Sequence, residues 1–241
     1  MQLFYNPDIT PNAYCPLDPE ESRHAVRVLR MCEGDELHVT DGKGNLYRCQ
    51  IVEANDKACV VNVIAQEFSI FNSQFLIHLA VAPTKNPSRM EWLVEKAVEI
   101  GVGEITLLQC DHSERSFLKT DRLEKLAVSA MKQSLHTVLP KINPAVKLSD
   151  WLNSQLSTLN SQLKFIAHCE ADKPRTPLAA ALKPGKDVVV LIGPEGDFSA
   201  EEIALALACG FQPVSLGPSR LRTETAALYA VVAFNLINDR S

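Results

Sequence analysis

Residues 188–196 read Val188-Val189-Val190-Leu191-Ile192-Gly193-Pro194-Glu195-Gly196, a run of five branched apolar residues that ends in a glycine–proline loop. Such a run predicts a strand that is buried on both faces, as in a parallel sheet. Ser199 and Glu202 follow with the spacing of a capping box, which predicts the start of a helix. The loop therefore connects the end of a buried strand to the beginning of a helix.

The same plan returns later in the chain. Val214-Ser215-Leu216 is followed by the loop Gly217-Pro218-Ser219-Arg220-Leu221-Arg222, and a helix opens near Thr223-Glu224-Thr225. Two loops at the carboxyl ends of parallel strands form a crevice in which backbone N–H groups can hold a ligand. Either loop alone is more typical of a tight turn that only connects two elements. Together they favour a functional site, because loops between apolar segments here carry four charges, at Glu195, Arg220, Arg222 and Glu224.

Strands and helices alternate from Phe75 onward. Phe75–Ala82 predicts a strand, and Ser88 with Glu91 predicts the capped start of a helix that ends at Gly101. Further strands are predicted at 104–109 and 165–168, and further helices at 121–135 and 150–156. This alternation predicts an α/β fold, an open and mostly parallel sheet with helices on both faces. The pattern changes near Asn72, so we divide the chain into residues 1–72 and 73–241.

Residues 1–72 have the pattern of a small β domain. Segments 37–40 and 47–52 flank the turn residues 41–45 and predict a hairpin, and 58–64 predicts another strand. Residues 20–31 predict a helix on which Arg23, Arg27 and Arg30 share one face. Such a stripe is compatible with a solvated surface or with a surface that contacts nucleic-acid phosphates.

The composition is that of an ordinary globular protein, with 46% apolar and 22% charged residues among 241. No apolar run reaches the roughly 18 residues of a membrane helix, and the first residues form no secretory signal, so we expect no membrane partner. The seven cysteines lack Cys-x-x-Cys spacing, which favours reduced thiols in a cytoplasmic protein and no metal site. The net charge of −5 excludes indiscriminate coating of nucleic acid and leaves room for a local basic face.

The chain resembles the RsmE family, uridine-N3 methyltransferases of small-subunit ribosomal RNA in the SPOUT superfamily. Two motifs carry the resemblance: Leu191-Ile192-Gly193-Pro194-Glu195-Gly196 with Phe198-Ser199-Ala200-Glu201-Glu202-Ile203, and Leu216-Gly217-Pro218 with Leu221-Arg222-Thr223-Glu224-Thr225-Ala226. Weaker matches extend it over nearly the whole chain. The resemblance implies a trefoil-knotted SPOUT sheet preceded by a PUA-like β-barrel that is associated with RNA binding.

The resemblance also implies a reaction, the methylation of N3 of a specific uridine in 16S ribosomal RNA. S-adenosyl-L-methionine would be the methyl donor, and 16S rRNA or the small ribosomal subunit the partner. One alternative is a SPOUT methyltransferase with another RNA target, such as a ribose 2′-hydroxyl or a tRNA base. Another is an RNA-binding protein without activity. Family members are homodimers, and the apolar helix at 226–237 is either such an interface or an ordinary core helix.

Loss of the N3 proton would leave negative charge on the uridine O2 and O4 atoms, and a fixed cation would stabilise that charge. Arg222 is the first candidate for this cation. Glu195 would face the cofactor or the uridine, whereas Glu224 would orient Arg222, accept the proton or complement its helix dipole. Cofactor binding is expected around the two loops, at Leu191, Gly193, Pro194, Gly196, Leu216, Gly217, Leu221 and Thr225.

RNA contacts are expected from Lys85, Arg89 and Arg115, which are similar to basic positions in the family. They are also expected from Arg23, Arg27 and Arg30, because their stretch resembles the family's PUA-like domain. Two positions depart from the family pattern. Many members have Gly-Arg where this chain has Leu135-His136, and Asp197 replaces a frequent glycine. The first departure puts one RNA contact of the family in doubt for this chain.

Overall fold

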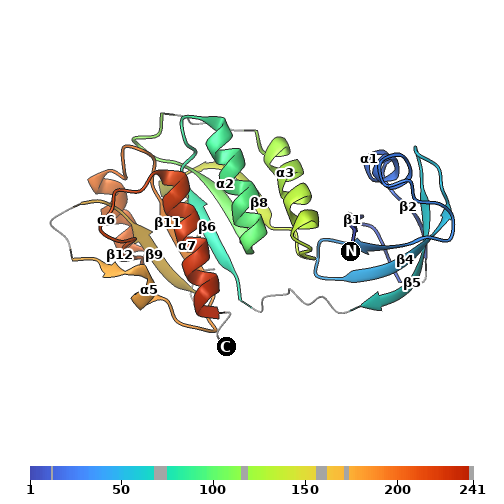
Figure 1. Cartoon of the computed structure of the whole chain (residues 1–241). Helices are drawn as coiled ribbons and strands as arrows, with labels where there is room; N and C mark the ends of the chain where they lie inside the picture. Colours follow the sequence, from blue (N-terminus) through green and yellow to red (C-terminus); the bar gives the residue numbers. More distant parts are fainter. Residues whose placement is uncertain (12, 68–74, 115–118, 156–161, 171–173, 239–241) are drawn as a thin grey trace. The chain divides into compact units, whose positions relative to one another are not determined.

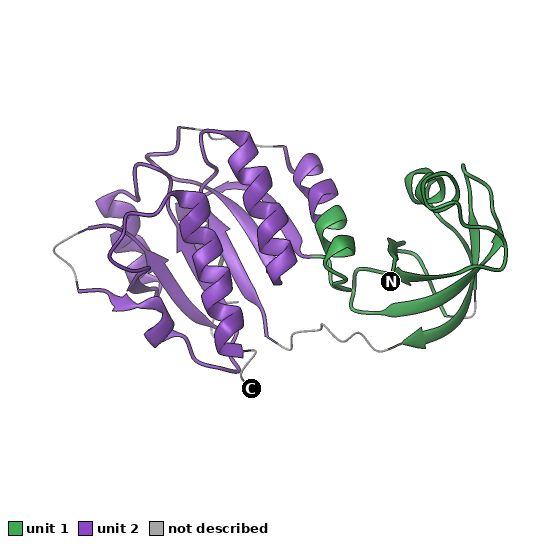
Figure 2. Ribbon diagram, in the orientation of Figure 1, with its two compact units in different colours: residues 1–72, 128–139 green, residues 73–127, 140–241 purple. Residues whose placement is uncertain are grey.

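The computed structural model describes residues 1–11, 13–67, 75–114, 119–155, 162–170 and 174–238 (Figure 1). The chain forms two compact units, residues 1–72 with 128–139 and residues 73–127 with 140–241 (Figure 2). Residues 128–139, which the sequence-based division assigns to the second domain, therefore pack with the first unit. Within the described ranges, no helix is both long enough and apolar enough to cross a membrane.

The second unit is built on a seven-stranded sheet in the order β10-β12-β9-β11-β6-β7-β8, with every neighbouring pair parallel. All five residues of the central strand β11 are buried, as its unbroken apolar run predicts. The predicted mostly parallel sheet is thus confirmed. The strands are β6 (Ile77–Val81), β7 (Glu104–Gln109), β8 (Lys141–Lys147), β9 (Leu163–Ala167), β10 (Thr176–Pro177), β11 (Val188–Ile192) and β12 (Gln212–Ser215).

Helices cover both faces of this sheet, as predicted. On one face α7 packs against α2 and against β6 and β11 (Figure 1). On the other face α4 and α6 enclose an apolar cluster that includes Val189 and Leu191 of β11. The helices are α2 (Pro87–Ile100), α3 (Thr120–Gln133), α4 (Leu148–Gln155), α5 (Leu178–Ala181), α6 (Ala200–Ala208) and α7 (Thr223–Asn238). The trefoil knot implied by the resemblance stays a prediction, because it concerns the path of the whole chain.

The ends of these helices follow local sequence rules, with one correction. Ser199 and Glu202 form the predicted capping box at the start of α6, and Gly101 ends α2 with a φ of 101°. The prediction that Ser88 caps α2 is wrong, because Asn86 is the N-cap and its side chain accepts a hydrogen bond from Ser88 N. Pro87 then occupies the first helical position, where its missing N–H costs nothing.

The first unit contains a five-stranded sheet in the order β1-β3-β4-β5-β2. The predicted hairpin is confirmed: β3 and β4 pair in antiparallel fashion, and Asp41 holds the turn by accepting hydrogen bonds from Lys43 N and Asn45 N. A hydrogen bond from Asn6 Nδ2 to the Pro16 carbonyl joins the ends of the two edge strands. The strands are β1 (Leu3–Tyr5), β2 (Tyr14–Pro16), β3 (Glu36–Thr40), β4 (Leu46–Glu53) and β5 (Val60–Glu67).

The end of α3 completes the first unit. The Thr137 carbonyl accepts hydrogen bonds from Gly44 N at 2.9 Å and from Thr40 Oγ1 at 3.0 Å. Lys132 forms an ion pair with Glu21, a carboxylate that is only 3% exposed. Burial raises the pKa of Glu21, and the contact with Lys132 opposes that rise. The first unit therefore depends on a segment that lies far along the sequence from its strands.

The predicted helix over residues 20–31 is confirmed as far as Val28, but it is not a single α-helix. Helix α1 (Pro19–Arg23) passes into a π-helical turn, η1 (His24–Val28), in which Leu29 N bonds to the His24 carbonyl at 3.0 Å. A wider turn rotates the following side chains away from α-helical spacing. Arg30 lies outside both helices, in the left-handed region with a φ of 57°. Arg23, Arg27 and Arg30 are exposed but do not lie at three equivalent positions of one helix face.

Candidate functional site

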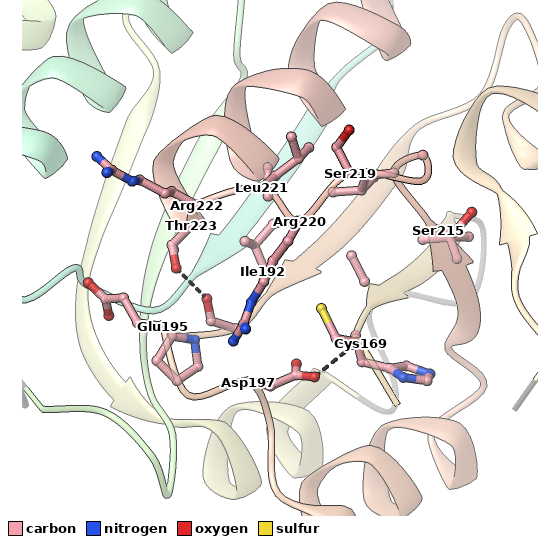
Figure 3. A pocket seen from close by; sticks show the side chains of 18 of the residues that line it. Cys169, Ile192, Glu195, Asp197, Ser215, Ser219, Arg220, Leu221, Arg222 and Thr223 are labelled. Carbon is pink, nitrogen blue, oxygen red and sulfur yellow. Dashed lines mark hydrogen bonds between the residues drawn. The ribbon is translucent and has the colours of Figure 1, made fainter. Parts of the chain in front are cut away.

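A cavity of ≈ 340 Å³ lies where β9, β11 and β12 end (Figure 3). The strands are parallel, so their carboxyl ends and the loops that follow them meet at one edge of the sheet. The cavity is lined by Ala167, His168, Cys169, Arg175, Ile192, Gly193, Pro194, Glu195, Gly196, Asp197, Val214, Ser215, Leu216, Gly217, Ser219, Arg220, Leu221, Arg222, Thr223 and Ala226.

The first loop, residues 193–197, follows β11 and is held from several sides. The Gly193 carbonyl accepts a hydrogen bond from Thr223 Oγ1 at 3.1 Å, and Glu195 Oε1 accepts one from Lys85 N at 3.0 Å. His112 Nδ1 lies 3.1 Å from the Gly196 carbonyl oxygen. A Cβ atom on Gly196 would lie only 3.0 Å from His112 Cβ, so this close approach favours glycine. The first loop is therefore a preorganised wall of the cavity.

Asp197 ends the first loop with a φ of 63°, in the left-handed region. Its two carboxylate oxygens accept separate backbone hydrogen bonds, Oδ2 from Cys169 N at 2.7 Å and Oδ1 from Phe198 N at 2.9 Å. Figure 3 shows the first of these bonds crossing from the loop after β9 to the loop after β11. Asp197 thus joins two segments of the cavity wall.

The second loop, residues 216–222, follows β12 and is open. Gly217 has a φ of 110°, and a Cβ atom there would meet no atom within 4 Å. In Figure 3 the Arg220 guanidinium extends toward the first loop and Asp197, whereas that of Arg222 points away from the other labelled side chains. Neither arginine has an ion pair or side-chain hydrogen bond within the part of the chain that the structure describes. Both are exposed and available to a ligand.

The cavity brings together most of the sequence-predicted cofactor and catalytic residues, namely Gly193, Pro194, Glu195, Gly196, Leu216, Gly217, Leu221 and Arg222. It does not include Leu191, Thr225 or Glu224 among its lining residues. Leu191 is completely buried and contributes to the apolar cluster beneath α4 and α6. Thr225 is exposed on the first turn of α7.

Glu224 lies beside Arg89 of α2. Its side chain is 9% exposed, and Oε1 lies 3.6 Å from Arg89 Nε. The other carboxylate oxygen, Oε2, is buried without a hydrogen-bond partner among the described residues. The structure therefore pairs Glu224 with Arg89, an expected RNA contact, and records no contact between Glu224 and Arg222.

The other expected RNA contacts are distributed over both units. Lys85 Nζ forms an ion pair with Glu114 at 2.6 Å, and this hydrogen-bonded carboxylate raises the pKa of Lys85. Arg27 pairs with Asp56 in the first unit. Arg115 lies outside the described residues.

Sequence reasoning missed several residues that shape the cavity. The sequence predicts only a helix start near Thr223, whereas this residue is 6% exposed and its hydroxyl donates a hydrogen bond to the first loop. Cys169 follows the end of a predicted strand, but no sequence motif around it indicates a place in the cavity wall. The charge of Arg220 in a loop between apolar segments is the only indication in the sequence, and the predicted site residues do not include it.

A family model described as the RNA methyltransferase domain matches residues 72–235, well over half of the chain. The chain belongs to this family. A second model, the RNA methyltransferase PUA domain, matches residues 17–64, in the sequence of the first unit. The cavity at the two glycine–proline loops thus lies within the matched methyltransferase domain.

Solved structures and curated relatives agree with this membership. A probable rRNA-methyltransferase from Porphyromonas gingivalis is 43% identical, has a TM-score of 0.91, and aligns over 100% of this chain and 99% of that one. The ribosomal RNA small subunit methyltransferase E of Neisseria gonorrhoeae, solved with S-adenosyl methionine, is 25% identical with a TM-score of 0.84 over 99% and 98% of the two chains. The protein of that name from Buchnera aphidicola (strain APS, of Acyrthosiphon pisum) is 28% identical over 96% of this chain and 91% of its own length.

Proposed function

We propose that this RNA methyltransferase transfers a methyl group from S-adenosyl-L-methionine to N3 of a specific uridine in 16S ribosomal RNA. The observation that carries the proposal is the cavity between the two glycine–proline loops, inside a matched RNA methyltransferase domain. Relatives named ribosomal RNA small subunit methyltransferase E, which align over nearly the whole chain, support the choice of RNA. The uridine-N3 specificity rests on the resemblance of the two loop motifs to the RsmE family.

The cavity fits S-adenosyl-L-methionine in size and chemistry. Its ≈ 340 Å³ falls within the usual range of small-molecule sites, about 300–1,000 Å³. Apolar side chains such as Ile192 and Leu221 suit the adenine ring, and the carboxylates of Glu195 and Asp197 suit a ligand with a positive sulfonium and ammonium. S-adenosyl-L-methionine would supply an electrophilic methyl group. We assign its binding to the backbone of the cavity wall around Gly193, Pro194, Gly196, Leu216, Gly217 and Leu221.

Arg222 and Glu195 are our proposed catalytic residues. Removal of the N3 proton places negative charge on the uracil carbonyl oxygens, and a guanidinium at the cavity rim stabilises that charge as it develops. Arg222 lies at this rim and has no carboxylate partner among the described residues, so its charge remains available. Glu195 also lines the cavity, and its second carboxylate oxygen can accept a proton from the base.

Glu224 acts through other residues in this proposal. It is buried, pairs with Arg89 and does not line the cavity, so it is poorly suited to accept a proton from the substrate. We assign it to the support of Arg89 at the start of α2. Its position in the first turn of α7 also complements the positive end of the helix dipole.

Basic residues outside the cavity would bind the RNA backbone. Lys85 and Arg89 lie near the start of α2, and Arg23, Arg27 and Arg30 are exposed on the first unit. Phosphate contacts of this kind hold a substrate in register while a single base is turned out of its stack. They allow a chain with a net charge of −5 to bind RNA through a local surface.

We also propose that the protein is a cytoplasmic homodimer. The outer face of α7 carries Tyr229, Val232 and Leu236, which are 41%, 36% and 55% exposed. Their spacing aligns them along one side of the helix, and such an apolar stripe is typical of an interface. Light scattering on the purified protein tests the dimer, and a monomer at micromolar concentration would contradict it.

A deletion strain tests the proposed reaction. Ribosomal RNA from cells lacking this gene should lose one 3-methyluridine, and purified protein with S-adenosyl-L-methionine should restore it on 16S rRNA or on small subunits. Mass spectrometry of nucleosides identifies the product. A ribose 2′-O-methyl product would contradict the proposed target, and absence of any saturable heat on titration with the methyl donor would contradict the enzyme itself.

A further inference from the structure

Two adjacent strands separate where they reach the cavity. The β9–β11 ladder extends to the pair Ala167 and Ile192, and the residues that follow both strands line the cavity. Past the end of the ladder, the Asp197 carboxylate spans the gap by accepting a hydrogen bond from Cys169 N at 2.7 Å. An ionised acceptor makes such a bond shorter and stronger than a bond between neutral groups.

The backbone of Asp197 is held in an unfavourable conformation to make this bond. Its φ of 63° is one that glycine adopts freely and that Asp and Asn adopt at a smaller cost in free energy than other residues. Three further contacts determine the position: Asp197 N bonds to the Pro194 carbonyl, its own carbonyl lies 3.1 Å from His112 Nδ1, and Oδ1 accepts from Phe198 N. A strained residue that its surroundings fix in this way points to a functional constraint.

We propose that Asp197 is a positioning residue for the methyl donor, which fixes the distance between the loops after β9 and β11 and so the width of the cavity. This inference rests on the proposed function. Both carboxylate oxygens of Asp197 are engaged by backbone N–H groups, so the side chain shapes the site and does not accept a proton from the substrate. Asp197 and Cys169 both line the cavity, so a change in their separation alters the volume offered to the ligand.

Two substitutions separate this role from a general contribution to stability. Asp197→Gly relieves the backbone strain but removes the acceptors for Cys169 N and Phe198 N. Asp197→Asn keeps one acceptor oxygen and a residue type that tolerates the left-handed region. Leu135→Gly is the matched control, because Leu135 has a φ of 62° and belongs to the first unit, so it relieves similar strain without touching the cavity.

The full-length protein is titrated with S-adenosyl-L-methionine by calorimetry, and each variant is unfolded by heat. We expect Asp197→Gly to raise the Kd roughly tenfold, the effect of losing the charge-assisted hydrogen bond that joins the two segments of the cavity wall, while its Tm stays the same or increases. Asp197→Asn should recover most of the affinity, and Leu135→Gly should leave the Kd unchanged. Amide hydrogen exchange at Cys169 should become faster in Asp197→Gly and remain slow in Asp197→Asn.

Two results would overturn the inference while leaving the proposed function intact: an Asp197→Gly protein that binds as tightly as the wild type, or one whose affinity falls only in parallel with its Tm. A wild-type protein that does not bind S-adenosyl-L-methionine would instead contradict the proposed function, and the role of Asp197 with it. The wild-type titration therefore distinguishes the two failures.

Discussion

The two glycine–proline loops look alike in the sequence but are held very differently in the structure. The first loop, residues 193–197, is fixed by contacts from Lys85, His112, Cys169 and Thr223. The second loop, residues 216–222, carries exposed side chains at Ser219, Arg220 and Arg222, and none of these three bonds to another described residue through its side chain. A common motif therefore produces one rigid wall and one open wall.

This difference suggests a division of roles between the loops. A wall that is fixed before binding lowers the entropic cost of holding a small ligand in one orientation. An open wall whose two guanidiniums have no partner among the described residues is better suited to a large, negatively charged substrate that must enter and leave. We therefore expect substitutions in the first loop, Glu195 excepted, to act on donor binding and stability, and substitutions of the two arginines in the second loop to act on turnover.

The largest effect is expected at Arg222. Arg222→Gln should lower kcat by about 10²–10³-fold, the usual consequence of removing a group that stabilises charge in the transition state, with little change in donor affinity. Single-turnover methylation of small subunits and calorimetry with S-adenosyl-L-methionine measure the two quantities. Arg220→Gln is the matched comparison on the same loop. A larger loss at Arg220 than at Arg222 would transfer the catalytic role to the guanidinium that extends toward the first loop in Figure 3.

The sequence was sufficient to predict the elements that are determined by interactions between residues close together in the chain. Residues 188–192 predict the buried strand β11 because a short run of branched apolar residues that ends at Gly and Pro is typical of a strand covered on both faces. The capping box of Ser199 and Glu202 predicts the start of α6, since both hydrogen bonds join residues three positions apart. The hairpin between β3 and β4 was predictable for the same reason.

The sequence does not predict elements that have a weak apolar pattern or an irregular helix geometry, or that depend on contacts between residues far apart in the chain. Strand β8 (Lys141–Lys147) begins and ends with lysine, contains Pro144 and lies at the edge of the sheet, so its apolar pattern is weak. The π-helical turn η1 has no sequence rule that distinguishes it from a continued α-helix. The residues that fix the first loop come from positions 85, 112, 169 and 223, and only the folded sheet brings them together.

The structure explains the conformation of Leu135, which stands where many family members have glycine. His136 N bonds to the Met131 carbonyl and Leu135 N to the Lys132 carbonyl, which is the Schellman arrangement at the end of α3. The residue before His136 must then be left-handed, and Leu135 has a φ of 62°. The glycine that many family members carry at this position satisfies the same backbone requirement at a lower cost. The backbone conformation thus accounts for this position without reference to RNA.

The next largest effect is expected at Gly196 of the rigid loop. Gly196→Ala places a Cβ atom 3.0 Å from His112 Cβ, so the protein should lose about 1–3 kcal/mol of unfolding free energy and bind the donor more weakly. Chemical denaturation and calorimetry measure both. The double variant with His112→Gly should recover part of the loss, because it removes the atom that clashes. Gly217→Ala in the open loop should not respond to His112→Gly, and equal rescue of both would contradict the proposed difference between the loops.

A smaller effect is expected where Thr223 joins the start of α7 to the first loop. Thr223→Val keeps the shape of the side chain but leaves the buried Gly193 carbonyl without its hydroxyl donor, which should cost about 1 kcal/mol of stability. Donor affinity should also fall, because the carbonyl belongs to the rigid wall. Thr225→Val is the control, since Thr225 is exposed on the same helix. If the two variants behaved alike, the hydrogen bond to Gly193 would contribute nothing to the rigidity of the first loop.

The smallest effect is expected at Ser219. The same change, serine to alanine, at Ser219 of the second loop and at Ser199 after the first loop compares how firmly the two regions are held. Ser219→Ala should change the unfolding free energy by less than about 0.5 kcal/mol, because the side chain is exposed and makes no hydrogen bond to another described residue. Ser199→Ala, at the helix that follows the first loop, should cost about 1 kcal/mol, because Ser199 Oγ accepts from Glu202 N and donates to Asp111. Urea unfolding followed by circular dichroism measures both. If Ser219→Ala lowered the unfolding free energy as much as Ser199→Ala does, the second loop would be as firmly held as the first. The openness of the second loop would then no longer explain why its arginines are available to the substrate.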